Sequence, residues 1–404
     1  MSLKHKLLEF PALYYYILWA RDIILRVFNK KKDDSSYESR VFTAVGRRLG
    51  VNTFFGYYDK SPILSGKVIY HESNNTILKP NRRNRVFVVV YDVSRSIEVY
   101  RQQIYAFNWQ QGARAHWISE NKFIYNNFID SVFSSVIVDL DTGEELIYEY
   151  SLADSCDKYL LTLDYKNLSI TDPSYGYFNL EGTGTDVEPI RKVDLNTLNV
   201  IELVTINDVR AKSKHRDKNK TKETFNHVMI SPCNHMFVFI YRYKINNIRY
   251  DELYLFNVRT NELKRLNLGD YISHYCWLDS CHLFGHVSCN DNKKGFYTYN
   301  IKTDQAFCES RLSSFTDGHP TKVTDSKVIF DSYPDKYGMQ MLYTYDLYLK
   351  EVEQIGAFYH PVLYRGVSRC DLHPRYDSDT NSLFIDTVHS NKRQLIQINL
   401  YKKL

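Results

Sequence analysis

Four histidines occupy the same position in a repeating sequence pattern: His227, His274, His319 and His373. Each opens a short strand-like segment and lies ten residues before an apolar residue of the next predicted strand. Neutral imidazole is the commonest protein ligand for borderline divalent metal ions. Three imidazoles with one oxygen donor could hold Mn, Zn or Fe and leave a position open. The pattern therefore predicts a metal site, and the alternative is a set of channel-lining histidines that bond to water and to each other.

Other polar residues accompany these histidines. Asp59 and Arg114 stand at the same position of two earlier repeats, while Asp317 and Asp371 each come two residues before a histidine of the set. Carboxylates of this kind accept a hydrogen bond from the second ring nitrogen of a ligand histidine. The residues predicted to bind substrate are Trp109, Gln110, Gln111, Asp59, Arg369, Arg375 and Arg393. This mixture of residue types suits a ligand with negative charge and flat sugar faces.

The elements that must position these residues repeat along the chain. An apolar segment ends in Asp or Asn followed by an aliphatic residue at positions 92, 139, 194, 257, 300, 346 and 399. Four short strands recurring every 43 to 63 residues are typical of a β-propeller blade. Seven copies predict an all-β, seven-bladed β-propeller, whereas a pair of β-sandwiches would not repeat one frame. We expect residues 41–49 to close the ring beside 383–401, and the third unit, near 151–165, fits the frame poorly.

Composition limits the classes of function. The chain has 404 residues, 52 Lys and Arg against 47 Asp and Glu, and ample apolar surface for a core. The near balance of charge gives no general reason to expect a nucleic-acid partner. The seven cysteines form no CxxC pair, which disfavours a disulfide framework or a zinc finger. Phosphate-loop, dinucleotide and GxSxG motifs are missing, so nucleotide-fuelled and serine-esterase chemistry is disfavoured.

The first 40 residues differ from the rest. The apolar stretch 7–28 is interrupted by Pro11 and by the Arg21-Asp22 pair, and Lys30 to Lys32 follow it. This predicts a short amphipathic helix and a linker at 1–40, ahead of a propeller at 41–404, rather than a spanning helix. The helix rests either on a membrane surface, through 7–32, or on its own protein. No cleavable signal is seen, so we expect a cytoplasmic protein, peripheral at the inner face of the membrane.

Two stretches are longer than a blade requires. Residues 172–190 are rich in Gly and aromatic residues, and residues 206–224 contain seven Lys and Arg. Both are predicted to be loops, because long stretches of this kind are usually functional or disordered. The basic stretch is either a solvated loop or a lid over an anionic ligand.

Several stretches of the second half resemble a known family. They are Thr316–Pro320 (TDGHP), Phe330–Asp335 (FDSYPD), Ser368–Arg375 (SRCDLHPR), Asp386–His389 (DTVH) and Lys392–Gln394 (KRQ). They resemble the oligogalacturonate lyase type of seven-bladed β-propeller, mainly over residues 225–400. The chain is also similar to propellers that accompany bacterial surface-polysaccharide genes.

The resemblance implies β-elimination of a uronate-containing glycan with the help of a divalent metal ion such as manganese. In the family, histidines and a glutamine bind the ion and a basic residue removes a proton. The implied metal ligands are His227, His319, His373 and His389, with Gln340 or Gln394 as the amide ligand. The implied catalytic residues are Arg114 as carboxylate clamp or base, Tyr57 or Tyr58 as proton donor to the leaving oxygen, and His274.

Three functional hypotheses remain open at this point. The first is a metal-dependent polysaccharide lyase with an acidic polysaccharide or oligosaccharide as its partner. The second is a non-catalytic scaffold or glycan-binding propeller in envelope polysaccharide biosynthesis. The third is a hydrolase with a carboxylate pair, for which Asp59 and Asp371 are the nearest candidates.

Overall fold

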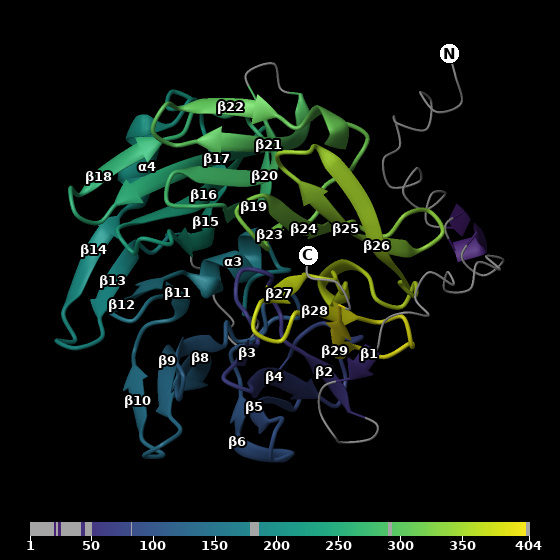
Figure 1. Cartoon of the computed structure of the whole chain (residues 1–404). Helices are drawn as coiled ribbons and strands as arrows, with labels where there is room; N and C mark the ends of the chain where they lie inside the picture. Colours follow the sequence, from purple (N-terminus) through teal and green to yellow (C-terminus); the bar gives the residue numbers. More distant parts are fainter. Residues whose placement is uncertain are drawn as a thin grey trace.

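The chain folds into seven small antiparallel sheets arranged around a central axis (Figure 1). This computed structural model describes residues 20–21, 23–25, 42–44, 51–81, 83–177, 186–289 and 293–400. The predicted all-β, seven-bladed β-propeller is confirmed. Within the described residues, no helix is both long and apolar enough to cross a membrane. Most of the predicted segment 1–40 lies outside the described residues, so its membrane contact stays a prediction.

Each blade is a meander of four strands, with one short extra strand in the first. Blade 1 contains β2 (Asn52–Phe54), β3 (Ile63–Leu64), β4 (Lys67–Ser73), β5 (Val86–Asp92) and β6 (Ile97–Ile104). Blade 2 contains β7 (His116–Ser119), β8 (Lys122–Ile129), β9 (Val132–Asp139) and β10 (Glu145–Tyr148). Blade 3 contains β11 (Leu152–Ser155), β12 (Tyr159–Thr162), β13 (Ile190–Asp194) and β14 (Val200–Val204). Blade 4 contains β15 (Thr221–Ile230), β16 (Met236–Ile245), β17 (Ile248–Asn257) and β18 (Glu262–Arg265).

The remaining blades follow the same order. Blade 5 contains β19 (Ile272–Trp277), β20 (His282–Ser288), β21 (Lys294–Asn300) and β22 (Gln305–Cys308). Blade 6 contains β23 (Thr321–Lys322), β24 (Lys327–Asp331), β25 (Met339–Asp346) and β26 (Glu351–Tyr359). Blade 7 contains β27 (Arg375–Asp377), β28 (Ser382–Thr387) and β29 (Gln394–Asn399), and β1 (Phe42–Ala44) completes it. Short helical segments are α3 (Tyr165–Thr171), α4 (Ile206–Lys212), η2 (Ser310–Leu312) and η3 (Gly366–Ser368).

The two ends of the described chain close the ring together. Strand β1 pairs antiparallel with β29, and Phe42 lies opposite Ile398. The predicted closure beside the last strands is therefore confirmed for residues 42–44, whereas residues 41 and 45–49 lie outside the described residues. Because β29 gains a partner on its outer side, the last blade keeps a complete four-stranded sheet.

The repeated Asp or Asn is a turn former. The side chain of Asp139 accepts hydrogen bonds from the backbone N–H groups of Asp141 (3.0 Å) and Thr142 (3.3 Å). Asn300 and Asp346 do the same for the residues two and three positions further on. Such side chains replace a missing backbone partner and stabilise the hairpin turn. The motif recurs because the first six blades need this turn between their third and fourth strands.

The third blade differs from the others in the connection between its second and third strands. Residues 163–189, which include α3, separate β12 from β13. Its inner strand still brings a buried carboxylate, Asp154, toward the neighbouring blades. Asp154 accepts a hydrogen bond from the backbone of Ile230 (2.8 Å) in blade 4 and pairs with Lys60 (2.5 Å).

The basic stretch is more ordered than the sequence predicts. Residues 206–212 form α4, whose first turn is fixed by a reciprocal pair of hydrogen bonds between Thr205 and Asp208. Strand β15 begins at Thr221, which leaves only residues 213–220 as a loop. α4 packs on the outer strand β18 at the edge of the ring (Figure 1). The prediction of a long loop is therefore wrong, and its position does not make it a lid over the axis.

Candidate functional site

The inner strands of blades 4 to 7 bring four histidine rings side by side. The ring centroids are 5.4 Å apart for His227 and His274, 4.0 Å for His274 and His319, and 4.3 Å for His319 and His373. All four residues are at most 5% exposed. The shared frame in the sequence therefore corresponds to a shared, buried location near the axis.

Backbone irregularities aim these side chains. His227 and His373 have positive φ values of 54° and 46°, a conformation that β-strands do not use. The pairing between inner and second strands also shifts between Asn226 and Met229 and between Ile272 and Tyr275. Such interruptions re-aim a side chain that the regular alternation of a strand would point elsewhere.

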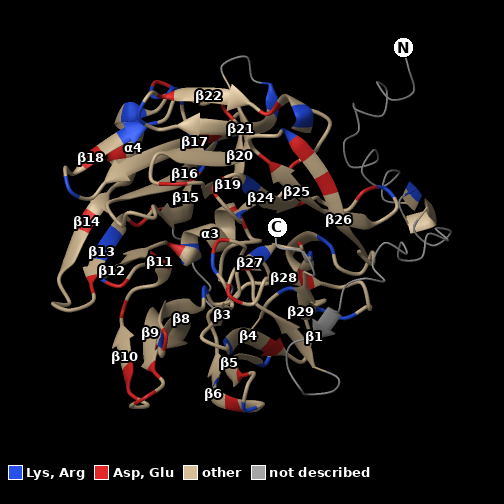
Figure 2. Ribbon diagram, in the orientation of Figure 1, with Lys and Arg blue, Asp and Glu red and all other residues tan. Residues whose placement is uncertain are grey.

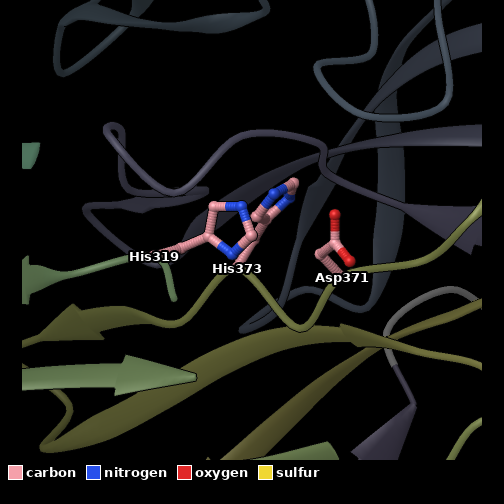
Figure 3. A group of neighbouring side chains, drawn as sticks. All are labelled: His319, Asp371 and His373. Carbon is pink, nitrogen blue, oxygen red and sulfur yellow. The ribbon is translucent and has the colours of Figure 1, made fainter. Parts of the chain in front are cut away.

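His319, Asp371 and His373 form a group whose potential ligand atoms all lie within 4.8 Å of one another (Figure 3). The Nδ1 atom of His373 donates to the carbonyl oxygen of Gly56 (2.6 Å), and Nδ1 of His319 lies 2.8 Å from the Asp331 carboxylate. Among the described residues, neither Nε2 atom has a hydrogen-bond partner. Two buried nitrogens without partners next to a carboxylate fit a divalent metal ion.

Asp331 orders this group from behind. Besides the His319 ring, its carboxylate accepts the backbone N–H of His319 (2.7 Å) and the backbone N–H of His373 (3.0 Å). One buried side chain thus ties blade 6 to blade 7. Gly318 permits the approach, since a Cβ atom there would lie 1.9 Å from the carbonyl oxygen of Asp331. The sequence pattern predicts this supporting role for Asp317 and Asp371 instead, because only the fold brings Asp331 close to the two histidines.

The charges of the three residues suit metal binding. Burial alone would raise the pKa of Asp371, but the Arg369 guanidinium outweighs it and holds the pKa below its ordinary value. Burial lowers the pKa of His373, so its ring is neutral at neutral pH. Burial also disfavours a charged His319, but Asp331 outweighs it and raises the pKa above its ordinary value. The raised pKa makes a proton compete more strongly with a metal ion at His319.

His274 has the geometry of a base. Its Nδ1 atom lies 3.0 Å from Ser273 Oγ and 3.3 Å from the Asp317 carboxylate, while its Nε2 atom lies 3.4 Å from the hydroxyl of Tyr175. Burial, with help from His319, lowers the pKa of His274 to about 4. The ring is thus neutral at neutral pH, and Asp317 holds the proton on Nδ1.

Tyr175 is a site residue that sequence reasoning missed. Its ring lies edge-on to His227 with centroids 4.9 Å apart, and Asn108 donates to its backbone carbonyl (2.9 Å). The only signal was the aromatic character of the stretch 172–190, of which residues 178–185 lie outside the described residues.

Tyr57 and Tyr58 lie across the inner face of the histidine cluster. The Tyr57 ring is 5.2 Å from His373, and the Tyr58 ring is 5.4 Å from His319. The Tyr58 hydroxyl donates to the backbone oxygen of Tyr275 (2.9 Å) and accepts its N–H (3.1 Å). The Tyr57 hydroxyl has no hydrogen-bond partner among the described residues. Burial raises the pKa of both tyrosines, so both keep their protons.

Arg114 and Asp59 engage each other. Their guanidinium and carboxylate groups form a two-fold hydrogen-bonded ion pair at 2.9 and 2.8 Å, and Arg114 Nε donates to the carbonyl oxygen of Ala153. Both side chains are at most 4% exposed. The expected use of Arg114 as clamp or base is thereby corrected, because its guanidinium is occupied within the protein.

Most of the residues expected to contact substrate hold the backbone instead. Gln110 donates to the carbonyl oxygen of Arg369 (2.7 Å), and Arg393 donates to those of Ser368 (2.8 Å) and Arg369 (3.0 Å). Gln340 donates to the carbonyl oxygen of Cys370 (3.0 Å). These three buried side chains fix the segment that carries Asp371, so Gln110 and Arg393 hold the backbone rather than contact a substrate. The Oε1 atom of Gln340 is buried without a hydrogen-bond partner among the described residues, so its expected role as an amide metal ligand stays a prediction.

Three further members of that set are also buried. Trp109 donates to the carbonyl oxygen of Leu78 (2.8 Å), and Arg375 pairs with Asp386 (3.0 Å) while donating to the backbone of Tyr57 (2.8 Å). Gln111 lines a cavity of about 10 Å³ beside His227, which is room for one water molecule. This leaves Arg369 as the half-buried member that can reach a ligand.

Arg369 belongs to the partly exposed edge of the cluster. Its side chain is 27% exposed, forms a bidentate ion pair with Asp371 (both 2.8 Å), and lies over the ring of Tyr333. Asp317, 14% exposed, belongs to the same edge. A ligand that approaches the metal group from this side meets a guanidinium and an aromatic face.

The expected metal ligands are only partly brought together. His389 lies outside the group of three: its Nδ1 atom is 3.1 Å from the Thr387 hydroxyl and its ring contacts Phe358. His227 is also outside it, beside His274. Gln394 accepts from Ser390 and is not part of the cluster. Of the four predicted histidine ligands, only His319 and His373 belong to this group, which Asp371 completes.

Comparison with known proteins supports the fold. No protein-family model matches the chain, and no curated protein matches it in sequence. Its structure is similar to that of an oligogalacturonate lyase in complex with manganese, at a TM-score of 0.59 and 12% identity over 90% of this chain and 97% of that chain. An oligogalacturonate lyase from Vibrio parahaemolyticus aligns at a TM-score of 0.58 and 11% identity over 89% and 94% of the two chains.

A third similar structure is the β-propeller domain of the Trilobed protease from Pyrococcus furiosus, at a TM-score of 0.51 and 12% identity over 86% and 97% of the two chains. At these identities the likeness concerns the fold alone. The chain has the β-propeller fold that the oligogalacturonate lyases also adopt.

Proposed function

We propose that this protein is a metal-dependent polysaccharide lyase that cleaves a uronate-containing bacterial surface glycan by β-elimination. The observation that carries the proposal is the pair of buried Nε2 atoms of His319 and His373, which have no partner among the described residues and lie next to Asp371. Two imidazoles and one carboxylate leave coordination positions open on a divalent ion such as Mn²⁺. The likeness in fold to a lyase in complex with manganese supports this choice.

A bound cation would supply charge stabilisation to a uronate carboxylate while the neighbouring C5 proton is removed. His274 takes the C5 proton on Nε2, since Asp317 keeps the other ring nitrogen protonated. The bond from C4 to the leaving oxygen breaks as the C4–C5 double bond forms. Tyr57 returns a proton to the leaving oxygen, because its hydroxyl is protonated and has no partner among the described residues. Arg369 binds a carboxylate of the substrate at the exposed edge.

Two measurements on one pair of proteins test the proposal. Elemental analysis of the purified protein should find a divalent metal that is absent from the His319→Ala, His373→Ala double variant. A panel of uronate-containing glycans, with metal supplied, should yield an unsaturated product with new ultraviolet absorbance. A metal content equal in both proteins, or no unsaturated product from any uronate glycan, would overturn the proposal.

A second candidate is a non-catalytic glycan-binding propeller in envelope polysaccharide biosynthesis. The burial of the histidine cluster favours it, since all four rings are at most 5% exposed. It predicts glycan binding that is unchanged in the same double variant. The hydrolase hypothesis is disfavoured, because the pKa values of Asp59 and Asp371 both lie below the ordinary value and neither carboxyl is kept protonated as a general acid.

A further inference from the structure

A groove lies at the outer edge of blade 4, between the segment after α4 and strand β18. Its volume is about 600 Å³. The charged residues that line it are Lys212, Lys214, Arg216, Lys264 and Arg265, against one acid, Asp217. The inner strand of the same blade carries His227, so the groove and the histidine cluster lie on opposite sides of this blade.

Positive charge is concentrated here. Residues 206–224 contain seven Lys and Arg and three Asp and Glu, which is a net +4 in a chain whose total is +5. Figure 2 shows the basic residues of α4 at the rim of the ring, and the other five follow this helix in the sequence. The remainder of the chain thus carries a net charge of only +1, so this segment holds most of the net positive charge of the protein.

The basic segment is held in place rather than mobile. The Ser213 hydroxyl donates to the buried Glu252 carboxylate (2.7 Å), which also accepts from Tyr243 (2.6 Å). The His215 ring packs edge-on against Tyr250 with centroids 4.8 Å apart, and the Lys220 ammonium lies 4.8 Å from the centre of the Tyr243 ring. Cations on an anchored segment lose less freedom when they bind a ligand.

Nearby acids neutralise the groove only weakly. Lys214 pairs with Asp270 (2.8 Å) and Lys264 with Asp304 (3.3 Å), but both lysines are more than 40% exposed. Exposed ion pairs of this kind contribute little and exchange readily for another anion. Lys212 is exposed and forms no ion pair with any described residue.

We propose that this groove binds an anionic polysaccharide chain through its carboxylates, at a second site away from the histidine cluster. Its lining offers only Ala211 and Leu263 as apolar side chains, which is too little apolar surface to insert into a bilayer. Its lining holds no aromatic side chain on which nucleotide bases could stack. The choice of a glycan among polyanions rests on the proposed function, whereas the existence of the site does not. A second contact along one polymer raises the local concentration of the substrate at the first.

The test measures binding of polygalacturonate to the full chain at several salt concentrations. The Lys212→Glu, Arg216→Glu double variant should bind about tenfold more weakly at low salt, with a salt dependence shallower by about two charges. The matched control is Lys158→Glu with Lys302→Glu, which reverses two exposed lysines in the turns of blades 3 and 5. The control and the His319→Ala, His373→Ala variant should keep the groove affinity, and the two surface double variants should keep the melting temperature of the wild type.

Two outcomes would overturn the inference. One is equal affinity of the groove variant and the control for polygalacturonate. The other is a wild-type chain that ignores the polymer at low salt but binds anionic lipid vesicles or a single-stranded oligonucleotide, with that binding lost in the groove variant. Since no metal or turnover is needed, failure of the proposed lyase activity would leave this result unaffected.

Discussion

At the scale of single residues, the ability of the candidate site to bind a metal depends on which histidine ring nitrogens are already hydrogen-bonded. The sequence frame predicts that four histidines meet, because their spacing follows the blades. It does not predict which nitrogens stay available, since the partners of His319 and His373 are Asp331 and Gly56, which are set by packing between blades. Tyr175 was missed for the same reason: it follows α3, which belongs to no repeat.

Asp331 and Asp317 allow the metal and the base to be separated. We expect Asp331→Asn to weaken Mn²⁺ binding about 10–100-fold, because the carboxylate that orients the His319 ring is lost. The matched change Asp317→Asn acts on His274 instead, so it should leave the metal affinity unchanged and reduce turnover. Calorimetric metal titration, paired with the product assay, checks both. Equal losses of metal affinity in the two variants would contradict the assignment.

At the scale of the elements, inner strands of adjacent blades are joined by buried ion pairs as well as by apolar packing. The pair of Asp59 in blade 1 and Arg114 ahead of blade 2 is the clearest case. The sequence identified both residues as members of the frame but not as partners. Their sequence separation of 55 residues carries no sign of a contact, because blade geometry alone brings them together.

We expect Asp59→Asn to lower the free energy of unfolding by about 3–5 kcal/mol, because Arg114 would remain buried without its counter-charge. Replacing both, as Asp59→Asn with Arg114→Met, should recover part of the loss. Denaturant unfolding measures the free energy of unfolding of the single and the double variant. The control Asp325→Asn breaks an exposed ion pair with Lys322 and should leave the midpoint nearly unchanged.

The same pair predicts a dependence on pH. Burial alone would raise the pKa of Asp59, but Arg114 outweighs it and lowers the pKa. The stabilisation is therefore present at neutral pH and is lost as the pH falls through the lowered pKa. Unfolding curves between neutral and acidic pH should fall more steeply for the wild type than for Asp59→Asn. Parallel curves would show that the pair does not contribute to acid sensitivity.

At the scale of the whole molecule, the ring is held shut by three residues from the beginning of the propeller. The repeat pattern predicted both the number of blades and this closure, since seven equal units leave one strand to be supplied from outside the last. What it did not predict was α4, whose short helix replaces most of a loop because Thr205 and Asp208 cap its first turn.

Removal of β1 should therefore destabilise the whole ring. We expect deletion of residues 1–44 to lower the melting temperature and to promote self-association through the exposed edge of β29. Deletion of residues 1–40, which keeps β1, should leave the edge of β29 paired and so cause no self-association. Calorimetry and light scattering compare the two proteins. Identical behaviour would show that closure through β1 adds nothing to stability.

The pairing of β1 with β29 also sets an order for synthesis. The partner of residues 42–44 is made only when residues 396–398 leave the ribosome, after six blades have already emerged. Until then β1 has no strand to pair with, and the ring of the nascent chain stays open. A chain that ends before residue 394 would lack β29 and could not close the ring, although six blades would be complete. Such a protein would be a substrate for quality-control proteases.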